Sequence, residues 1–150
     1  MKVLAIDPGT KCGWAHSDGP SGVFDLSIRR DESRDYRLIR LRSYLNQIHD
    51  ANGIEMVAFE AARNAGPNMQ GALVVASEFQ SVIKTFCIDK GLNYRGRSPT
   101  EIKKHATGKG NAKKAAMVEA AEAKWPDKQI QDDNEADALL LLSLTLEEMG

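Results

Sequence analysis

Three acidic residues lie at positions where a carboxylate could perform chemistry. Asp7 follows the apolar run 3–6 and precedes a Pro-Gly turn, and Glu60 follows the apolar run 54–59. Asp137 lies about one turn into a predicted helix, directly before an apolar run in which an unpaired charge is costly. Aspartate also favours turns, so Asp7 taken alone is compatible with a purely structural role.

Together these carboxylates predict a metal site. Like charges that gather at one place repel one another unless a cation lies between them, and hard oxygen ligands suit Mg²⁺, with Mn²⁺ as a substitute. Two such ions about 4 Å apart can activate a water molecule and stabilise the leaving oxygen during phosphodiester hydrolysis. We therefore expect two ions per active site, held by Asp7, Glu60 and Asp137.

A fourth ligand is expected on the helix that carries Asp137. Asp133 and Asn134 precede Asp137 by one turn and share its face, whereas Glu135 points roughly 160° away. Asp133 offers a full charge, and Asn134 offers only a carbonyl dipole. Acidic residues favour helix N-termini in any case, which gives Asp133 a structural explanation as well. Both residues are candidates for the fourth ligand.

The charges are unevenly distributed along the chain, although the formal net charge is only −1. Between residues 84 and 114 the basic residues greatly outnumber the acidic ones, and from residue 119 onward the opposite holds. Two solvated faces that cancel would explain this pattern. The functional interpretation is a phosphate-binding surface beside a cluster of acids that holds divalent cations.

Periodicity and turn signals predict the elements that must position these residues. We expect strands at 3–7, 12–15, 22–28, 54–60 and 92–97, and helices at about 33–52, 69–90, 98–105, 112–124 and 132–148. Ser98 and Asn111 are the expected N-caps of two of these helices. Because a helical connection precedes the fourth strand, that strand can lie parallel to the first, and Asp7 and Glu60 then emerge at the same edge of the sheet.

Length and composition fit one folded domain over residues 1–150. Hydrophobic residues make up 42% of the chain and charged residues 27%, and the two cysteines lack metal-type spacing. No apolar run reaches the length needed to cross a bilayer, and the first residues lack the pattern of a signal peptide. We therefore expect a protein of the reducing cytoplasm with no membrane partner.

Four sequence blocks resemble those of one enzyme family. In order and in combination they are similar to the RuvC family of Holliday junction resolvases, in its small phage and bacterial form, within the RNase H-like superfamily. The blocks are Leu4–Thr10 followed by Gly13–Ala15, Val57–Glu60, Ser98–Lys104 followed by Thr107–Lys114, and Asn134–Leu139. This resemblance implies a cytoplasmic enzyme of a bacterial cell or a phage-infected host.

The resemblance also implies a fold and an activity. The fold is of the α/β class: an RNase H-like, mixed five-stranded sheet, made of an antiparallel three-strand meander and two parallel strands, with helices on both faces. The enzyme is implied to be a homodimer that pairs through the helix 69–90 and cuts four-way DNA junctions symmetrically with a divalent metal.

The blocks assign roles to individual residues. Asp7, Glu60 and Asp137 match the metal-binding acids of the family, and Lys103 and Lys114 match its DNA-contacting basic positions. We expect branched DNA to contact neighbouring residues of the same segments as well, namely Lys104, Lys109, Lys113, Arg63 and Asn64.

The chain departs from the family pattern at two places. Asn134 stands where members often have an acid or a histidine, so either its amide oxygen coordinates the metal or Asp133 takes that role. Register favours Asn134 with Asp133 acting through water, whereas charge favours Asp133. Arg63 stands where the bacterial enzymes carry an aromatic wedge, which leaves junction opening and sequence preference open.

Three other functions compete with this interpretation. Asp-x-Gly-Thr after a strand also opens the phosphate loop of actin-like ATPases and sugar kinases, but those need a second such loop and two full domains. A related nuclease that cuts forks, flaps or other branched DNA would carry the same acids. A non-catalytic junction-binding module would not need Asp7, Glu60 and Asp137 together.

Overall fold

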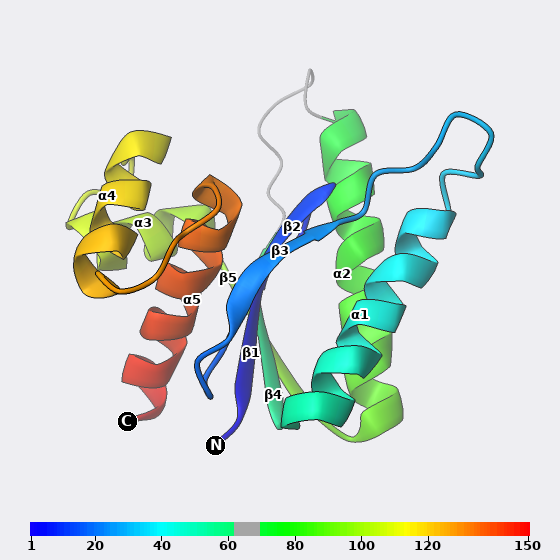
Figure 1. Ribbon diagram of the computed structural model, residues 1–150, viewed down its shortest axis with the longest axis horizontal. Helices are drawn as coiled ribbons and strands as arrows, with labels where there is room; N and C mark the ends of the chain where they lie inside the picture. Colours follow the sequence, from blue (N-terminus) through cyan, green and yellow to red (C-terminus); the bar gives the residue numbers. More distant parts are fainter. Residues whose placement is uncertain (62–69) are drawn as a thin grey trace.

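The computed structural model describes residues 1–61 and 70–150, and in that part of the chain a five-stranded sheet lies between two layers of helices (Figure 1). The strand order is β3-β2-β1-β4-β5, with antiparallel pairing from β3 to β1 and parallel pairing from β1 to β5. The strands are β1 (Val3–Asp7), β2 (Lys11–His16), β3 (Ser21–Asp25), β4 (Met56–Glu60) and β5 (Asn93–Arg97). This is the mixed sheet that the sequence predicts.

Five helices cover the two faces of the sheet. The helices α1 (Tyr36–Asn52) and α2 (Gln70–Lys90) lie together on one face, whereas the other face is covered by α3 (Pro99–Thr107), α4 (Lys114–Lys124) and α5 (Asp133–Met149) (Figure 1). None of these five helices is both long and apolar enough to cross a membrane.

The central strand β1 belongs to two cores because helices cover both of its faces. Leu4 and Ile6 pack into the core under α1 and α2, whereas Val3 and Ala5 pack into the core under α5. All four side chains are buried, as is typical of a strand with both faces covered. Successive side chains alternate between the faces, so Asp7 points to the α5 side, like Ala5.

Several element boundaries differ from the sequence-based prediction for local reasons. The strand β3 ends at Asp25 rather than at residue 28, because the Asp25 carboxylate accepts a hydrogen bond from the Ser27 amide at 2.9 Å and turns the chain. The helix α1 begins at Tyr36, after a loop in which the Glu32 carboxylate binds the Arg29 amide.

The helix caps were predicted with mixed success. Ser98 caps α3 with a complete capping box, in which its hydroxyl accepts from the Glu101 amide at 3.2 Å, as expected. The prediction that Asn111 caps the next helix is wrong. That helix begins at Lys114, with Lys113 at the N-cap position and no side-chain cap bond.

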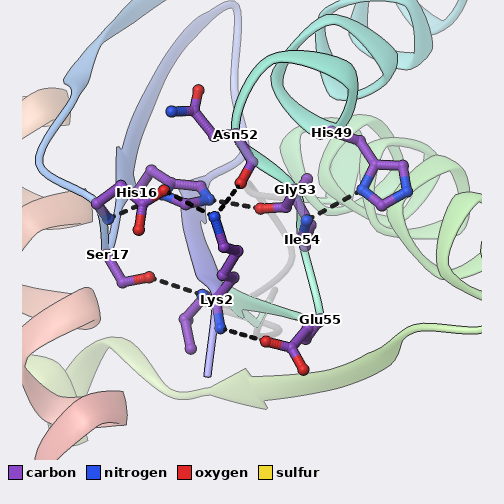
Figure 2. A network of polar contacts seen from close by, with 10 residues as sticks. Lys2, His16, Ser17, His49, Asn52, Gly53, Ile54 and Glu55 are labelled. Carbon is purple, nitrogen blue, oxygen red and sulfur yellow. Dashed lines mark hydrogen bonds and ion pairs between the residues drawn. The ribbon is translucent and has the colours of Figure 1, made fainter.

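A polar network anchors the start of β1, at the end of the strand opposite Asp7 (Figure 2). The Lys2 amide donates to Glu55 Oε1 at 2.8 Å, and the Val3 amide donates to Ser17 Oγ at 2.9 Å. His16 is buried, with Nε2 2.7 Å from the Gly53 carbonyl oxygen and Nδ1 accepting from the Asp18 amide. These bonds satisfy backbone groups at the strand ends, so this network is structural.

Candidate active site

The carboxyl ends of β1 and β4 bring Asp7 and Glu60 side by side. The strands are parallel and Ile6 pairs with Phe59, so the next residue of each strand stands at the same edge of the sheet. Both acids are half-buried, and their side chains share a hydrogen bond. The helical connection through α1 therefore places the two carboxylates together, as the crossover argument predicts.

The N-terminal end of α5 brings the third acid to this edge. Asp132 caps the helix, with its carboxylate accepting from the Glu135 amide at 2.9 Å, and Asp137 follows about one turn later. The helix continues as the buried run Ala138–Leu142, which packs on β1 and β2. Asp137 lies directly before this buried run, and it lines a common pocket with Glu60.

The acids at the edge disfavour one another's charge. Burial of the Asp7 carboxyl is the largest of the effects that raise its pKa well above the usual range. The hydrogen bond and charge of Glu60 add to that effect, followed by the charges of Asp137 and Asp133. The charged form of the Asp7 carboxyl is therefore disfavoured in the absence of a cation.

Asp137 has the same electrostatic character. Desolvation, assisted by the charges of Glu60 and Asp133, raises its pKa to about 7, although Lys103 and Lys114 act in the opposite direction. Lys103 and Lys114 thus lie close enough to lower the pKa of Asp137, but their effect is smaller than that of burial.

The two candidates for the fourth ligand have different partners. Asp133 Oδ2 lies 3.8 Å from Lys114 Nζ, and Asn134 Nδ2 donates to Asp132 Oδ2 at 3.2 Å. The side-chain nitrogen of Asn134 is bound to Asp132, so its side-chain oxygen Oδ1 is the atom left for a cation. The arrangement leaves both Asp133 and Asn134 as candidates.

Glu135 points away from the three acids, as helical geometry predicts. It is only 3% exposed, and its carboxylate accepts hydrogen bonds from Ser21 Oγ at 2.7 Å and from the Gln131 amide at 2.8 Å. This carboxylate therefore holds α5 to β3 and does not belong to the candidate site.

A pocket of about 350 Å³ opens beside the acids. Its wall is basic and comes from α3 and the start of α4, so it joins the acidic edge to the positively charged segment. It is lined by Glu60, Asp137, Lys103, Lys113, Lys114, Asn111, Ala112 and Met117. Three of the lysines predicted to contact DNA, Lys103, Lys113 and Lys114, therefore line the same pocket as Glu60 and Asp137, and their role in binding phosphate stays a prediction.

The remaining predicted DNA-contacting residues lie apart from this pocket. Lys104 and Lys109 are exposed and do not line it. Arg63 and Asn64 lie outside the described residues, as does the start of the segment predicted to pair two copies of the chain, Met69.

Asn111 is a pocket residue that the sequence interpretation treated only as a helix cap. It lies in the polar loop between α3 and α4 and lines the pocket with Lys113. Its place in the sequence between Lys109 and the pair Lys113–Lys114 was the signal that could have assigned Asn111 to the basic pocket.

The donor set fits a divalent cation bound in an open site. Among residues 1–61 and 70–150, no group of three or more His, Cys, Asp or Glu side chains could hold a metal ion as these side chains stand. Mg²⁺ is usually held by one or two carboxylates and completes its octahedron with water and substrate phosphate oxygens. Paired carboxylates whose charge is disfavoured in the absence of a cation, beside a basic pocket, match that mode of binding.

Comparisons with known proteins agree with this architecture, although no protein-family model matches the chain. The crossover junction endodeoxyribonuclease RuvC of Rhodococcus opacus is 30% identical over 126 residues, which cover 79% of this chain and 66% of the relative. The RuvC protein of Brachyspira hyodysenteriae is 28% identical over 148 residues, covering 94% and 91%. The structure of Thermus thermophilus RuvC in complex with a Holliday junction substrate superposes with a TM-score of 0.74 at 18% identity, covering 94% of this chain and 90% of that one.

A mixed sheet of this order, with helices on both faces and acids at the ends of its adjacent parallel strands, defines an RNase H-like fold. Within that fold, the chain belongs to the RuvC family. It spans 66% of the length of its Rhodococcus opacus relative, about two thirds.

Proposed function

We propose that this chain is a metal-dependent endonuclease that cleaves four-way DNA junctions by phosphodiester hydrolysis. The observation that carries the proposal is the convergence of Asp7, Glu60 and Asp137 at one edge of the sheet, beside a pocket lined by Lys103 and Lys114. The names of the relatives, crossover junction endodeoxyribonucleases, support this substrate class.

The three acids would hold Mg²⁺, with Mn²⁺ as a substitute and two ions per site. Bound there, the metal would supply an activated water and charge stabilisation for the leaving oxygen. Asp7 and Glu60 would present their carboxylate oxygens to the cation from the adjacent ends of β1 and β4. Asp137, near the N-terminal end of α5, would contribute a third carboxylate from the helix that packs on the sheet.

The lysines at the pocket would bind the phosphates that flank the scissile bond. Lys103 lies on α3, and Lys113 and Lys114 lie at the start of α4, where positive side chains oppose the helix dipole. An anion between these side chains would remove that conflict. The lysines therefore orient the backbone of the DNA relative to the acids rather than read its bases.

Symmetric cutting of a junction needs two active sites. One chain carries one set of acids, so we propose a homodimer in which α2 forms the contact between the subunits. We further propose that the enzyme acts in the cytoplasm of a bacterial cell or a phage-infected host, which the bacterial origin of the relatives supports.

Cleavage of a synthetic four-way junction tests this function. We expect paired incision with Mg²⁺ and none with EDTA, and much weaker cutting of a linear duplex of the same sequence. Asp7→Asn and Glu60→Gln should each abolish cutting and retain junction binding, because binding depends on phosphate contacts and not on the metal. Cutting at the wild-type rate by either variant would contradict the proposed site.

A broader branched-DNA nuclease is the second candidate. Arg63 stands where bacterial relatives are expected to carry an aromatic wedge, so the means of opening a junction centre differ in this chain. A replication fork and a flap therefore belong in the same assay. Cutting of these substrates as fast as the four-way junction would favour the broader activity.

A further inference from the structure

The backbone of α5 lies very close to the sheet at Gly13, in the middle of β2. A methyl group added there would lie 1.9 Å from the carbonyl oxygen of Asn134, 2.3 Å from its carbonyl carbon and 2.8 Å from the amide nitrogen of Glu135. These are backbone atoms, so no change of rotamer relieves the overlap. A glycine inside a strand commonly marks such an approach of another backbone.

A second contact holds the same turn of α5 against the next strand. Glu135 reaches across to Ser21 at the start of β3, and its other carboxylate oxygen accepts from the Gln131 amide. Lys128 Nζ lies 3.0 Å from the same Ser21 hydroxyl and 2.7 Å from the Gly19 carbonyl oxygen. The first turn of α5 therefore contacts two strands of the antiparallel meander, β2 through Gly13 and β3 through Ser21.

The backbone held in this way belongs to the same part of α5 as the candidate metal ligands. Asn134 and Glu135 contact the sheet, whereas Asp133 and Asp137 stand on the face toward the acids of β1 and β4. A helical turn is internally rigid because its hydrogen bonds fix the backbone. The height of Asn134 above β2 therefore sets the height of Asp137 above the sheet edge.

We propose that Gly13 is a positioning residue for the active site. Its missing side chain lets the first turn of α5 rest directly on β2, and this contact sets the distance at which Asp137 faces Asp7 and Glu60. The effect on catalysis rests on the proposed function, whereas the effect on the position of α5 does not.

Gly13→Ala tests the position directly, with Gly9→Ala as the matched control in the same hairpin. A methyl at Gly9 meets only the Lys11 carbonyl oxygen, at 3.8 Å, an ordinary contact. In crystal structures we expect the first turn of α5 to move away from β2 by about 1 Å in Gly13→Ala, because close-packed interiors do not absorb such an overlap. Gly9→Ala should leave α5 in place.

The metal response distinguishes positioning from a general loss of stability. We expect Gly13→Ala to weaken Mn²⁺ binding, measured by electron paramagnetic resonance, and to raise the Mg²⁺ concentration for half-maximal cutting. A displacement of about 1 Å at a reacting centre lowers the rate about 100-fold. Junction affinity in EDTA should stay within about twofold of wild type, because the phosphate contacts are made by α3 and α4.

A milder variant keeps the test open if Gly13→Ala does not fold. Ser21→Ala removes the hydroxyl that donates to the Glu135 carboxylate. We expect a rise of about threefold or more in the Mg²⁺ midpoint, in the range of a lost hydrogen bond. Ser27→Ala, which removes a hydroxyl that binds Asp25 on the surface, is its control.

The two proposals fail in different ways. Wild-type protein that cuts no junction, together with a displaced α5 in Gly13→Ala, would overturn the proposed function and leave the role of Gly13 intact. Active wild-type protein, together with a Gly13→Ala variant whose α5 position and Mg²⁺ midpoint are unchanged, would overturn the positioning role.

Discussion

At the residue scale, the site carries an electrostatic cost that a cation would relieve. The pKa of Asp7 is raised well above its usual range, and that of Asp137 is raised to about 7, in both cases by desolvation first and by neighbouring acids second. Charged Asp137 is thus disfavoured in the folded, metal-free chain. The carboxylates proposed to bind a metal therefore lower the stability of the metal-free protein.

This effect predicts that Asp137→Asn stabilises the metal-free protein. The folded-state pKa of about 7 lies above the ordinary value of 3.8. The unfolded chain therefore loses the proton first, and the stability that Asp137 contributes below pH 4 disappears as the pH rises to about 7. In EDTA we expect Asp137→Asn to raise the free energy of unfolding by about 1–2 kcal/mol at pH 8 and hardly at all at pH 4.

Urea denaturation at the two pH values measures this difference, with the exposed Asp127→Asn as the control. The control should change the free energy of unfolding little at either pH. An Asp137→Asn variant that is no more stable than wild type at pH 8 would contradict the prediction.

The fourth ligand gives a second prediction at this scale. Asn134 occupies the family's usual position, and its bond to Asp132 leaves the amide oxygen for a cation. Asn134→Asp should preserve or raise Mg²⁺-dependent cutting, Asn134→Leu should remove most of it, and Asp133→Ala should have the smaller effect. Initial cutting rates across a Mg²⁺ titration measure this order, and the reverse order would assign the ligand to Asp133.

At the scale of elements, α3 and α4 form a basic wall beside an acidic edge built by β1, β4 and α5. Ser98 starts α3 with a full capping box, whereas α4 starts without a side-chain cap and with lysines at its N-terminus. A helix start of this kind is suboptimal by itself. It becomes favourable when the lysines bind an anion, which suits a phosphate-binding wall.

The double variant Lys103→Ala/Lys114→Ala should therefore weaken DNA binding and leave the fold intact. Each lost phosphate contact lowers the slope of log affinity against log salt by about 0.9, so we expect a change of about two for the pair. Fluorescence anisotropy of a labelled junction in EDTA, over a range of salt concentrations, gives the slope. Lys90→Ala at the end of α2 is the control, and an unchanged slope in the double variant would remove these lysines from the DNA contact.

At the scale of the whole molecule, the outer surface of α1 and α2 carries apolar side chains that the fold leaves in solvent. Val74 on α2 is 58% exposed and Ile39 on α1 is 63% exposed. A pair of chains related by a two-fold axis would cover such a surface with a single self-complementary patch and provide two active sites. The proposed dimer through α2 is consistent with this distribution.

We predict that Val74→Lys converts the dimer into a monomer, because a charge buried in the contact would lack a partner. Sedimentation at micromolar concentration measures the mass, and Tyr94→Lys, which replaces an exposed aromatic residue on β5, is the control. The variant should also lose paired incision and retain single nicks. A wild-type monomer with full paired incision would contradict the proposed dimer.

The sequence determined most of the fold because its signals are local. Apolar runs, Pro-Gly and Asn-Gly turns and the capping box at Ser98 specify elements within a few residues of themselves. The parallel pairing of β1 with β4 also followed, because a helical connection between them allows that pairing. The sequence-based prediction was wrong where a single side chain decides an element boundary. Asp25 ends β3 earlier than its periodicity predicts. Asn111 lines the pocket and does not cap α4.

Only the tertiary structure decided how α5 meets the sheet. The sequence shows Asp137 at one turn from a helix start, but the height and rotation of that turn depend on residues far away in the chain. Gly13 admits the backbone of Asn134, and Ser21 binds Glu135 across 114 positions. Such contacts leave no local signature in the sequence. A small residue in a strand gives the same local pattern whether or not another backbone packs against it. The identity of the acids is thus a property of the sequence, and their distance is a property of the packing.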